Sequence, residues 1–482
     1  MRLGYFDGIV WGEGHMLGQF MSWLLVLEHE LLLFAGFWIV LGSIDDIGVD
    51  ALWLWLKLSG RAKTGVIDDA RATAPLSGHA AVIIAAWQES AVIGHTLRHA
   101  LSVWSQRNVT IYVGCYCNDP ATIEAAMQAA GGDPRVRVVI HGRAGPTTKA
   151  DCLNRLYAAI CEDDARRGSG SRFIMMHDAE DMVHAAELAA VDAALSQADY
   201  VQLPVRPEPQ RASRWVAGHY TDEFTEAHAK VLVVRDALGA AIPAAGVGCA
   251  FTRPTLERIA AQRRAEGGDG PFAGECLTED YELGMLVWRA GGRSRYLRLR
   301  DERGALVATR AYFPAALDAS VRQKTRWILG IAFQGWDRLG WGHRPSDWWM
   351  VLRDRRGPLA AFVFACAYGL LLVEAVLGGL RLWGSVGSES FSPVLTLILT
   401  LCWASLIWRC VNRFAFTTAE YGVWEGLLSI PRGPVANIIA IMAGYRALAR
   451  YLGSLRGAPV TWDKTSHDEH PAMQGSLQGA MA

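Results

Sequence analysis

The sequence predicts an α/β domain with a mostly parallel sheet, joined to α-helices that cross or lie along a membrane. Short apolar runs alternate with helix-compatible segments between residues 80 and 311, and long apolar stretches lie on both sides of that region. The chain of 482 residues is 51% hydrophobic and contains 19 Trp, which is rich for a soluble protein. A chain of this length exceeds one ordinary core, so we expect two or more structural units.

Three stretches are apolar enough to be considered as membrane spans. The first, Phe20 to Gly42, is interrupted by Glu28, His29 and Glu30, whereas the second, Pro358 to Leu380, carries only Glu374. The third, Phe391 to Trp408, has no charged residue. Because a bilayer core needs about 20 mostly apolar residues, we expect one span within residues 1–60 and two within residues 357–410. The ionisable residues either line a polar path or mark the ends of segments.

Basic residues predict how these spans are oriented. They follow the first span, precede the second and follow the third, at Lys57, Arg61, Lys63, Arg353, Arg355, Arg356, Arg409 and Arg413. The loop between the second and third spans offers only Arg381. The positive-inside rule therefore predicts a cytoplasmic middle region and C-terminus, with the N-terminus facing outward.

Two further segments have the character of membrane-interface structure. Residues 51–58 alternate like a strand, but they also suit a short Trp-rich helix at the headgroups. Residues 411–467 predict either an amphipathic helix beneath the middle region or a fourth span. The polar residues 468–482 predict a flexible tail.

The middle region, residues 75–315, has the pattern of βαβ units. Strands are predicted at Ala81–Ala86, Val109–Val113, Val136–Ile140 and Phe173–Met176, with helices at Val92–Trp104 and Thr122–Ala130 between the first three. This alternation predicts a parallel sheet. No G-x-G-x-x-G or Walker-type loop follows any of these strands, which argues against a dinucleotide or P-loop site.

Polar residues follow the predicted strands, where ligands of parallel sheets gather. The fourth strand runs into Asp178, Glu180 and Asp181. Clustered carboxylates repel one another, so they either bind a divalent cation or begin a helix whose dipole favours them. Glu89 and Asp119 follow the first and second strands, although Asp119 before a proline also suits a simple turn.

Two more motifs follow later in the chain. Thr278-Glu279-Asp280 offers further carboxylates, although Thr278 also suits a helix cap. Gln323, Arg326 and Trp327 form a Q-x-x-R-W pattern in residues 316–356, directly before the second span.

In this order, the motifs resemble those of the processive family 2 glycosyltransferases, relatives of cellulose and hyaluronan synthases. The resemblance is strongest to the inner-membrane glycosyltransferases of bacterial phage-adsorption and exopolysaccharide systems, and it covers nearly the whole chain. The shared segments are Gly145-Pro-Thr-Thr-Lys-Ala-Asp-Cys-Leu-Asn154, His177-Asp-Ala-Glu-Asp181, Ala245-Gly-Val-Gly248, Leu277-Thr-Glu-Asp-Tyr281, Val321-Arg-Gln-Lys-Thr-Arg-Trp327 and Trp462-Asp-Lys-Thr465.

The resemblance implies a cytoplasmic GT-A fold, a Rossmann-like and mostly parallel α/β architecture, beside transmembrane and amphipathic interface helices. It implies that Asp178 and Glu180, with Asp181 as a further candidate, hold Mg²⁺ or Mn²⁺ against a nucleotide diphosphate. Glu89, Asp119, Lys149 and Asp178 would hold the donor nucleotide, although a lysine in a loop is often simply solvated. Asp280, flanked by Thr278 and Glu279, would be the general base. Gln323, Arg326 and Trp327 would meet the acceptor and pyrophosphate, and Trp327 also suits a membrane-interface aromatic.

The resemblance thus implies an inverting transferase of the bacterial inner membrane that moves a sugar, expected to be an N-acetylhexosamine, from a UDP-sugar donor to a glycan acceptor. An outer-membrane export partner and a separate cyclic di-GMP-responsive partner are further expectations of the resemblance. The net charge of −1 gives no reason to expect a nucleic-acid partner. A non-catalytic envelope signalling or scaffold protein that keeps the fold remains the alternative. A secondary transporter is disfavoured because no inverted repeat is visible.

Overall fold

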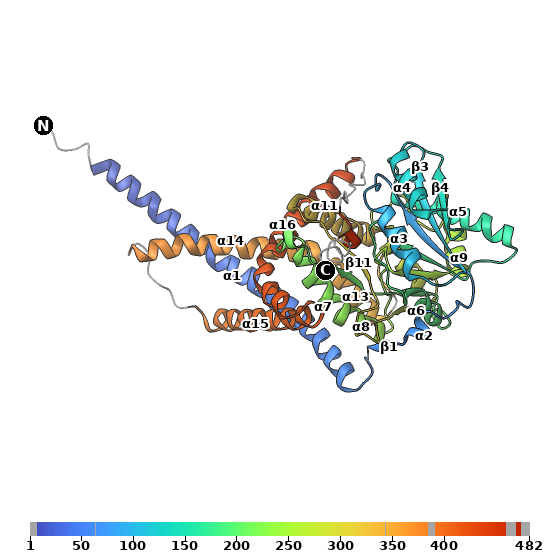
Figure 1. Ribbon diagram of the computed structural model, residues 1–482. Helices are drawn as coiled ribbons and strands as arrows, with labels where there is room; N and C mark the ends of the chain where they lie inside the picture. The colour runs from blue at the N-terminus through green and yellow to red at the C-terminus, as the bar shows by residue number, and fades with distance from the viewer. Residues whose placement is uncertain (1–6, 63, 343, 384–390, 459–468, 474–482) are drawn as a thin grey trace.

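The computed structural model describes residues 7–62, 64–342, 344–383, 391–458 and 469–473. The predicted motif at Trp462–Thr465 lies outside these residues. An α/β domain forms one end of the molecule, and three long helices, α1 (Asp7–Leu58), α14 (Gly357–Leu382) and α15 (Pro393–Tyr421), extend away from it (Figure 1). The two predicted kinds of structure are therefore separated in space.

The central sheet of the α/β domain has seven strands in the order β4-β3-β2-β5-β8-β6-β9. Neighbouring strands run parallel except at β8, which is antiparallel to both β5 and β6. The strands are β2 (Ala80–Ala85), β3 (Val109–Tyr116), β4 (Val136–His141), β5 (Phe173–His177), β6 (Tyr200–Gln202), β8 (Cys249–Thr252) and β9 (Ser294–Tyr296). The predicted mostly parallel sheet and its first four strands are confirmed.

Helices cover both faces of this sheet. In β2, Val82 and Ile84 enter the core on the side of α3 (Ile93–Val103) and α4 (Pro120–Ala130). Ala81 and Ile83 enter the opposite core with α5 (Lys149–Arg167) and α9 (Arg253–Ala265). Alternate side chains of a strand point to opposite faces, so a strand buried on both sides needs an unbroken apolar run. These unbroken apolar runs are the reason that the strands could be predicted from the sequence.

The remaining elements connect the sheet to the long helices. Two small parallel pairs lie outside the main sheet: β1 (Gly65–Ile67) with β10 (Leu299–Asp301), and β7 (Val205–Pro207) with β11 (Thr309–Ala311). The other helical elements are α2 (Asp69–Ala72), α6 (Glu187–Ala194), η1 (Arg211–Ser213), α7 (Gly218–Glu226), η2 (Ala227–Val231), α8 (Leu232–Ala237), α10 (Glu279–Arg289), α11 (Leu317–Trp327), η3 (Ile328–Gln334), α12 (Gly335–Leu339), α13 (Pro345–Arg355) and α16 (Val423–Ser454).

Four of the described helices are long and apolar enough to cross a membrane: Gln19–Leu58 within α1, then α14, α15 and α16. The three expected spans are among them. Helix α16 also packs against α7 and α11 of the α/β domain. The Trp-rich residues 51–58 are the end of α1, so the strand interpretation of that segment is wrong.

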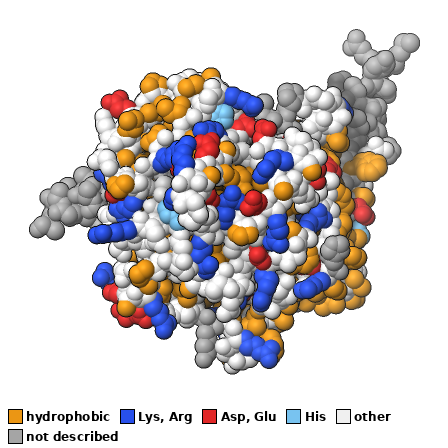
Figure 2. Space-filling view, turned by 90° about the vertical axis from the view of Figure 1, so that its right-hand side faces the viewer, with side chains coloured by type: hydrophobic (Ala, Val, Ile, Leu, Met, Phe, Trp, Pro, Cys, Tyr) orange, Lys and Arg blue, Asp and Glu red, His pale blue; other side chains and the backbone are white. Residues whose placement is uncertain are grey.

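The surface at the far end of the α/β domain contrasts with these helices. Figure 2 views the end facing away from α14 and α15, and Lys, Arg, Asp and Glu side chains are mixed across it with small hydrophobic areas. Large apolar side chains are instead exposed along the long helices, such as Leu372, Trp403 and Ile407. This division fits a membrane protein whose α/β domain faces water.

Ionisable residues of α1 pair with later helices. Glu28 is buried, and Arg381 donates to it at 3.1 Å and lies 3.3 Å from Glu374. His29 and Glu30 instead lie exposed beside each other. Of the three ionisable residues that interrupt the first span, Glu28 is therefore the one that joins two helices.

A second charged cluster joins α1 to the start of α14. Asp45 and Asp46 accept hydrogen bonds from Arg353 and Arg356, with Arg356 at 2.5 Å from Asp45 and 2.8 Å from Asp46. Trp349 also donates its indole N–H to Asp45 at 2.5 Å. Arg353 and Arg356, which precede the second expected span, thus also bind the first one.

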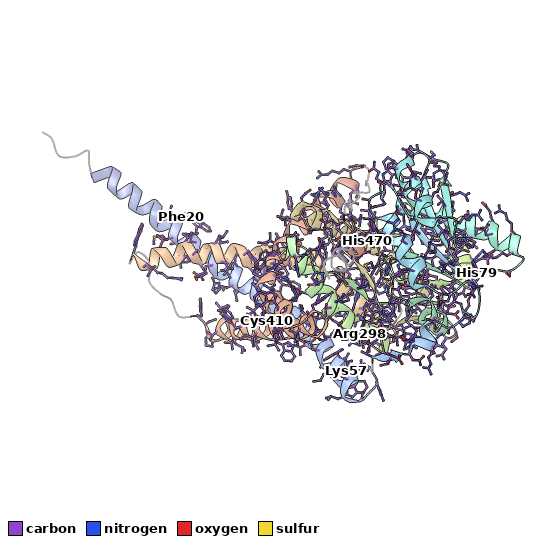
Figure 3. The ribbon with its side chains drawn as sticks, in the orientation of Figure 1. Phe20, Lys57, His79, Arg298, Cys410 and His470 are labelled. Carbon is purple, nitrogen blue, oxygen red and sulfur yellow. The ribbon has the colours of Figure 1, made fainter. Side chains whose placement is uncertain are left out.

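The expectation of a flexible tail is wrong for residues 469–473. The His470 ring, which is labelled in Figure 3, is buried, stacks on His95 with ring centroids 5.7 Å apart and lies 3.2 Å from the Thr96 hydroxyl. A polar tail can pack when its imidazole finds both a ring to stack on and a hydrogen-bond partner.

Gly284 tests the packing of α10, the helix that begins at Glu279. A Cβ added there would lie 2.5 Å from the backbone nitrogen of Ala244. Backbone atoms cannot move aside cheaply, so we expect Gly284→Ala to destabilise the protein by about 1–3 kcal/mol. Thermal unfolding of the detergent-purified protein measures this, with Gly142→Ala as the control because a Cβ there meets no atom within 4 Å. Equal melting temperatures for the two variants would contradict the close packing.

Candidate active site

Three of the predicted site residues are brought together by the order of the sheet. Strands β3, β2 and β5 are neighbours and run parallel. Asp119, Glu89 and Asp178 follow these three strands, so they gather at one edge of the sheet. Convergence of strand ends is the geometry that creates sites in open α/β sheets.

A cavity of about 650 Å³ opens at this edge, a volume typical of small-molecule sites. It is lined by all the predicted site residues except Asp119, namely Glu89, Lys149, Asp178, Glu180, Asp181, Thr278, Glu279, Asp280, Gln323, Arg326 and Trp327. Arg353 and Arg356, just before α14, also line it. The cavity therefore lies between the sheet and the bases of the apolar helices.

Asp119 does not line the cavity but contacts the turn beside it. It caps α4 by accepting a hydrogen bond from the backbone N–H of Thr122 at 3.3 Å. Its other oxygen accepts the N–H of Gln88 at 2.6 Å. Gln88 has a φ of 55°, which is uncommon for a residue with a side chain. Asp119 thus caps α4 and holds the backbone of Gln88, the residue before Glu89, rather than forming a simple turn.

Lys149 is the first residue of α5, not a loop residue. Thr148 caps this helix and exchanges hydrogen bonds with Asp151 in a capping box. The Lys149 ammonium lies 2.5 Å from Asp178 Oδ1, and its side chain is 18% exposed, so it is not simply solvated. Burial alone would lower the pKa of Lys149, but the charges of Asp178, Glu279 and Asp280 outweigh burial and raise it. The lysine remains charged among three carboxylates.

Asp181 has a partner on the side of the core. Its Oδ2 accepts the N–H of Asp178 at 2.9 Å and lies 3.1 Å from His177 Nδ1, while His177 Nε2 lies 3.3 Å from Glu187. Burial would lower the pKa of His177, but its hydrogen bonds to both carboxylates raise that pKa to about 9. His177 thus pairs with Asp181 on the side of the core, while Asp178 and Glu180 are the two D-x-D carboxylates that line the cavity.

These two carboxylates fit a hard divalent ion. Oxygen donors suit Mg²⁺ and Mn²⁺, and Mg²⁺ is commonly held by one or two carboxylates together with substrate phosphates. Within the residues that the structure describes, no three His, Cys, Asp or Glu side chains are grouped to hold a metal ion. An ion on Asp178 and Glu180 would therefore take its other ligands from a bound phosphate compound or water.

Asp280 lies against a glycine that leaves room for it. A Cβ added to Gly246 would meet Asp280 Oδ2 at 2.5 Å, and Gly246 has a φ of +76°, a conformation that favours glycine. Asp280 Oδ1 accepts the N–H of Tyr281 at 2.8 Å. Burial raises the pKa values of Asp280 and of Glu279, the latter to about 7. The run 245–248 carried no predicted role, and its Gly246 shapes the pocket of Asp280.

Thr278 precedes α10 without capping it. It occupies the cap position, but its side chain makes no capping hydrogen bond. A Cβ on Gly330 would instead meet the Thr278 hydroxyl at 2.4 Å, so Thr278 packs against the π-helix η3. This contact links the T-E-D segment to the residues that follow Q-x-x-R-W.

The Q-x-x-R-W residues reach the cavity from α11. The Trp327 ring centroid lies 6.1 Å from that of Tyr220 and 6.2 Å from that of Phe224, so Trp327 belongs to an aromatic cluster of the α/β domain. The side-chain oxygen of Gln323 is buried without a hydrogen-bond partner among the described residues. A buried acceptor beside a cavity is suited to a ligand hydroxyl.

The sequence reasoning missed one buried pair in the cavity wall. Arg235 donates to both oxygens of Asp354 at 2.8 and 2.9 Å, and the Tyr281 hydroxyl donates to Asp354 at 2.9 Å. Both Arg235 and Asp354 line the cavity. The two residues are 119 positions apart, and neither belongs to a local motif, so no signal in a single sequence pointed to them.

The fold and the acidic cavity define the class of the protein. Residues 78–330 match the family described as Glycosyltransferase like family 2, which is more than half of the chain. The chain belongs to this family, and its α/β domain has the GT-A fold. The resemblance predicted from the motifs is confirmed, and membership supports glycosyltransferase activity.

Two curated relatives extend the similarity beyond that domain. They are the Bacteriophage adsorption protein B of Escherichia coli K12 and the Bacteriophage N4 adsorption protein B of Escherichia coli O157:H7. Each is 32% identical over 96% of this chain, and the chain spans 65% of the length of each relative.

Solved structures are more distant. A mannosyltransferase from Pyrobaculum calidifontis in complex with GDP-Man and Mn²⁺ is 15% identical, with a TM-score of 0.48 over 85% of this chain and 98% of that one. A glucosyl-3-phosphoglycerate synthase from Mycobacterium tuberculosis in complex with Mn²⁺, UDP and glucosyl-3-phosphoglycerate is also 15% identical, with a TM-score of 0.31 over 50% and 74%.

Gly246 provides a test of the site that leaves every charged residue in place. We expect Gly246→Ala to reduce sugar transfer by at least tenfold, because the added methyl group displaces the Asp280 carboxylate. Gly168→Ala is the matched control, since Gly168 also has a positive φ of +70° but a Cβ there meets nothing within 4 Å. Both variants carry similar backbone strain, so a similar loss of transfer in both would contradict the role of Gly246.

Proposed function

We propose that this chain is an inverting glycosyltransferase of the bacterial inner membrane. It transfers a sugar, an N-acetylhexosamine in our proposal, from a UDP-sugar to a growing surface or secreted polysaccharide. The observation that carries the proposal is the cavity in which Lys149, Asp178 and Asp280 meet the Q-x-x-R-W residues beside the apolar helices. Family membership supports the type of reaction.

The donor occupies the side of the cavity formed by the strand ends. Glu89, held by Asp119 through the turn at Gln88, contacts the nucleoside. Asp178 and Glu180, with Asp181 behind them, hold Mg²⁺ or Mn²⁺, which supplies Lewis-acid neutralisation of the diphosphate when bound. Lys149 is close enough to Asp178 to add a positive charge at the same phosphates.

The acceptor occupies the side formed by α10 and α11. Its hydroxyl oxygen forms a bond to the anomeric carbon while the bond from that carbon to the diphosphate oxygen breaks, and UDP leaves with the electron pair. Asp280 takes the proton of the hydroxyl. Because the attack opposes the leaving group, the anomeric configuration inverts. Arg326 offers charge to the departing diphosphate, and Trp327 offers a flat face to a sugar ring.

In this proposal, the apolar helices beside the cavity determine where the glycan product begins to grow. The cavity borders Arg353 and Arg356 at the start of α14, so a growing glycan begins beside the bilayer. The cytoplasmic orientation follows from the basic residues at the helix ends. An outer-membrane export partner and a separate cyclic di-GMP-responsive partner complete the proposed system.

The first test is release of the nucleoside diphosphate by detergent-purified protein, measured as UDP from a panel of UDP-sugars and as GDP from GDP-mannose as the alternative donor. We expect release with a UDP-N-acetylhexosamine that requires Mg²⁺ or Mn²⁺ and is abolished by a chelator. Asp280→Asn removes the proton acceptor, and the loss expected for a general base is about 10²–10⁴-fold.

The control for this variant is Asp269→Asn, which changes an exposed carboxylate outside the cavity and leaves activity intact. If Asp280→Asn kept full activity, the assignment of the base would be wrong. If no donor supported release even with native membranes and an acceptor glycan present, the non-catalytic scaffold would become the better description.

Gln323 allows a separate test, in which stability and activity change independently. Gln323→Leu removes a buried acceptor that lacks a partner, so we expect an unchanged or higher melting temperature. If the amide oxygen binds substrate, kcat/KM falls by about 3–10-fold, the effect of one hydrogen bond. A lower melting temperature with unchanged kcat/KM would instead make Gln323 a structural residue.

A further inference from the structure

A second and larger cavity shares no lining residue with the cavity that contains Lys149, Asp178 and Asp280, which we call the transfer cavity. Its volume is about 1050 Å³, and its walls come from the end of α1, from α8 and from the segment between α10 and β10. Seven of its lining residues are Lys or Arg, whereas Asp236 is the one carboxylate among them. Such a concave surface of one sign attracts and concentrates anions.

One wall carries four arginines between positions 289 and 298. Arg295 pairs with Asp236 at 3.1 Å, and Arg298 pairs with Glu420 at 2.5 Å. Arg289 and Arg293 have no carboxylate within ion-pair distance among the residues that the structure describes. The local acids therefore neutralise only part of this wall.

The opposite wall is the end of the first candidate span. Lys57 and Arg61 line it, and Arg61 lies over the Trp55 ring at 4.8 Å. Arg344, just before α13, adds another cation. Figure 3 shows Lys57 and Arg298 on neighbouring elements at this edge of the molecule. The side-chain cations of Lys57, Arg61 and Arg344 form no ion pair with a carboxylate in the described part of the chain, and Asp347 bonds only the backbone N–H of Arg344.

The position of the cavity indicates which anion reaches it. Leu54, Trp55 and Leu58 are 51%, 50% and 80% exposed, and they surround Lys57 at the end of a helix long enough to span the bilayer. Tryptophan and basic residues together are typical of the headgroup level of a membrane. The anionic groups concentrated at this level of a membrane are those of lipid headgroups.

We propose that this cavity binds the phosphate of an anionic phospholipid headgroup at the membrane surface. Five cations without acidic partners surround the phosphate, while the exposed Leu54 and Leu58 contact the acyl chains. The site is distinct from the transfer cavity and does not depend on the proposed reaction. A soluble phosphate compound offers the same chemistry without the acyl chains, so the test separates the two sources.

The test uses the full chain in nanodiscs of phosphatidylcholine that contain photoactivatable phosphatidylglycerol. We expect crosslinks on peptides that contain residues 54–61 and 289–298. Arg289→Gln with Arg293→Gln breaks no ion pair, and crosslinking should fall about fivefold for each arginine removed. Arg264→Gln with Arg303→Gln is the matched control, since both side chains are exposed outside the cavity and the change in charge is equal.

The outcomes separate the alternatives. The lipid site is supported if the Arg289→Gln, Arg293→Gln variant (the cavity pair) loses crosslinking and the control pair does not. It also requires that glycerol 3-phosphate competes only weakly with the lipid for crosslinking. If glycerol 3-phosphate binds the detergent-purified chain and displaces the lipid, the phosphate site stands but its ligand is soluble, and the lipid assignment is overturned. Equal crosslinking in the cavity pair and the control pair overturns the site itself. Thermal unfolding confirms that both pairs fold.

Discussion

A single buried ammonium group, that of Lys149, is the interaction on which the transfer cavity depends. The carboxylates of Asp178, Glu279 and Asp280 come from two different parts of the sequence and would repel one another in a partly dry cavity. Lys149 is held among them because Thr148 and Asp151 fix the start of α5 at this point. The cap of α5 therefore positions the Lys149 ammonium that offsets the charge of these carboxylates. A bound divalent cation would add to this positive charge.

The sequence predicted the parts of the fold that are governed by local pattern. The two-sided burial of β2, β3 and β5 produces apolar runs, and the acids that end these strands had to meet once the strands were parallel neighbours. Contacts across the chain could not be predicted in this way. The roles of Asp119 behind the cavity, of Gly246 against Asp280 and of the Arg235–Asp354 pair depend on which elements pack together. The packed residues 469–473 were missed for the same reason, since polarity alone does not reveal a partner such as Thr96.

The cavity lies directly beside the apolar helices. Its walls include Trp327 of α11 and the arginines just before α14, so the residues proposed to meet the acceptor lie in elements that lead into the apolar helices. The arginines serve two purposes, because Arg353 and Arg356 also bind Asp45 and Asp46 of α1. A shift of α1 at Asp45 and Asp46 would therefore move arginines that line the cavity. The position of α1 and the shape of the cavity are linked through these contacts.

The pairing of Asp45 with Arg353 also has a consequence for biosynthesis. The two residues are 308 positions apart, and synthesis at about 5–20 residues per second separates their emergence from the ribosome by roughly 15–60 s. During that interval α1 is already a finished apolar helix that carries the two carboxylates Asp45 and Asp46 without their arginine partners. Its neighbours in the bilayer are made only after the whole α/β domain has left the ribosome. The final lateral position of the first helix is thus fixed late, and a folded α/β domain is available as the template on which the helices assemble.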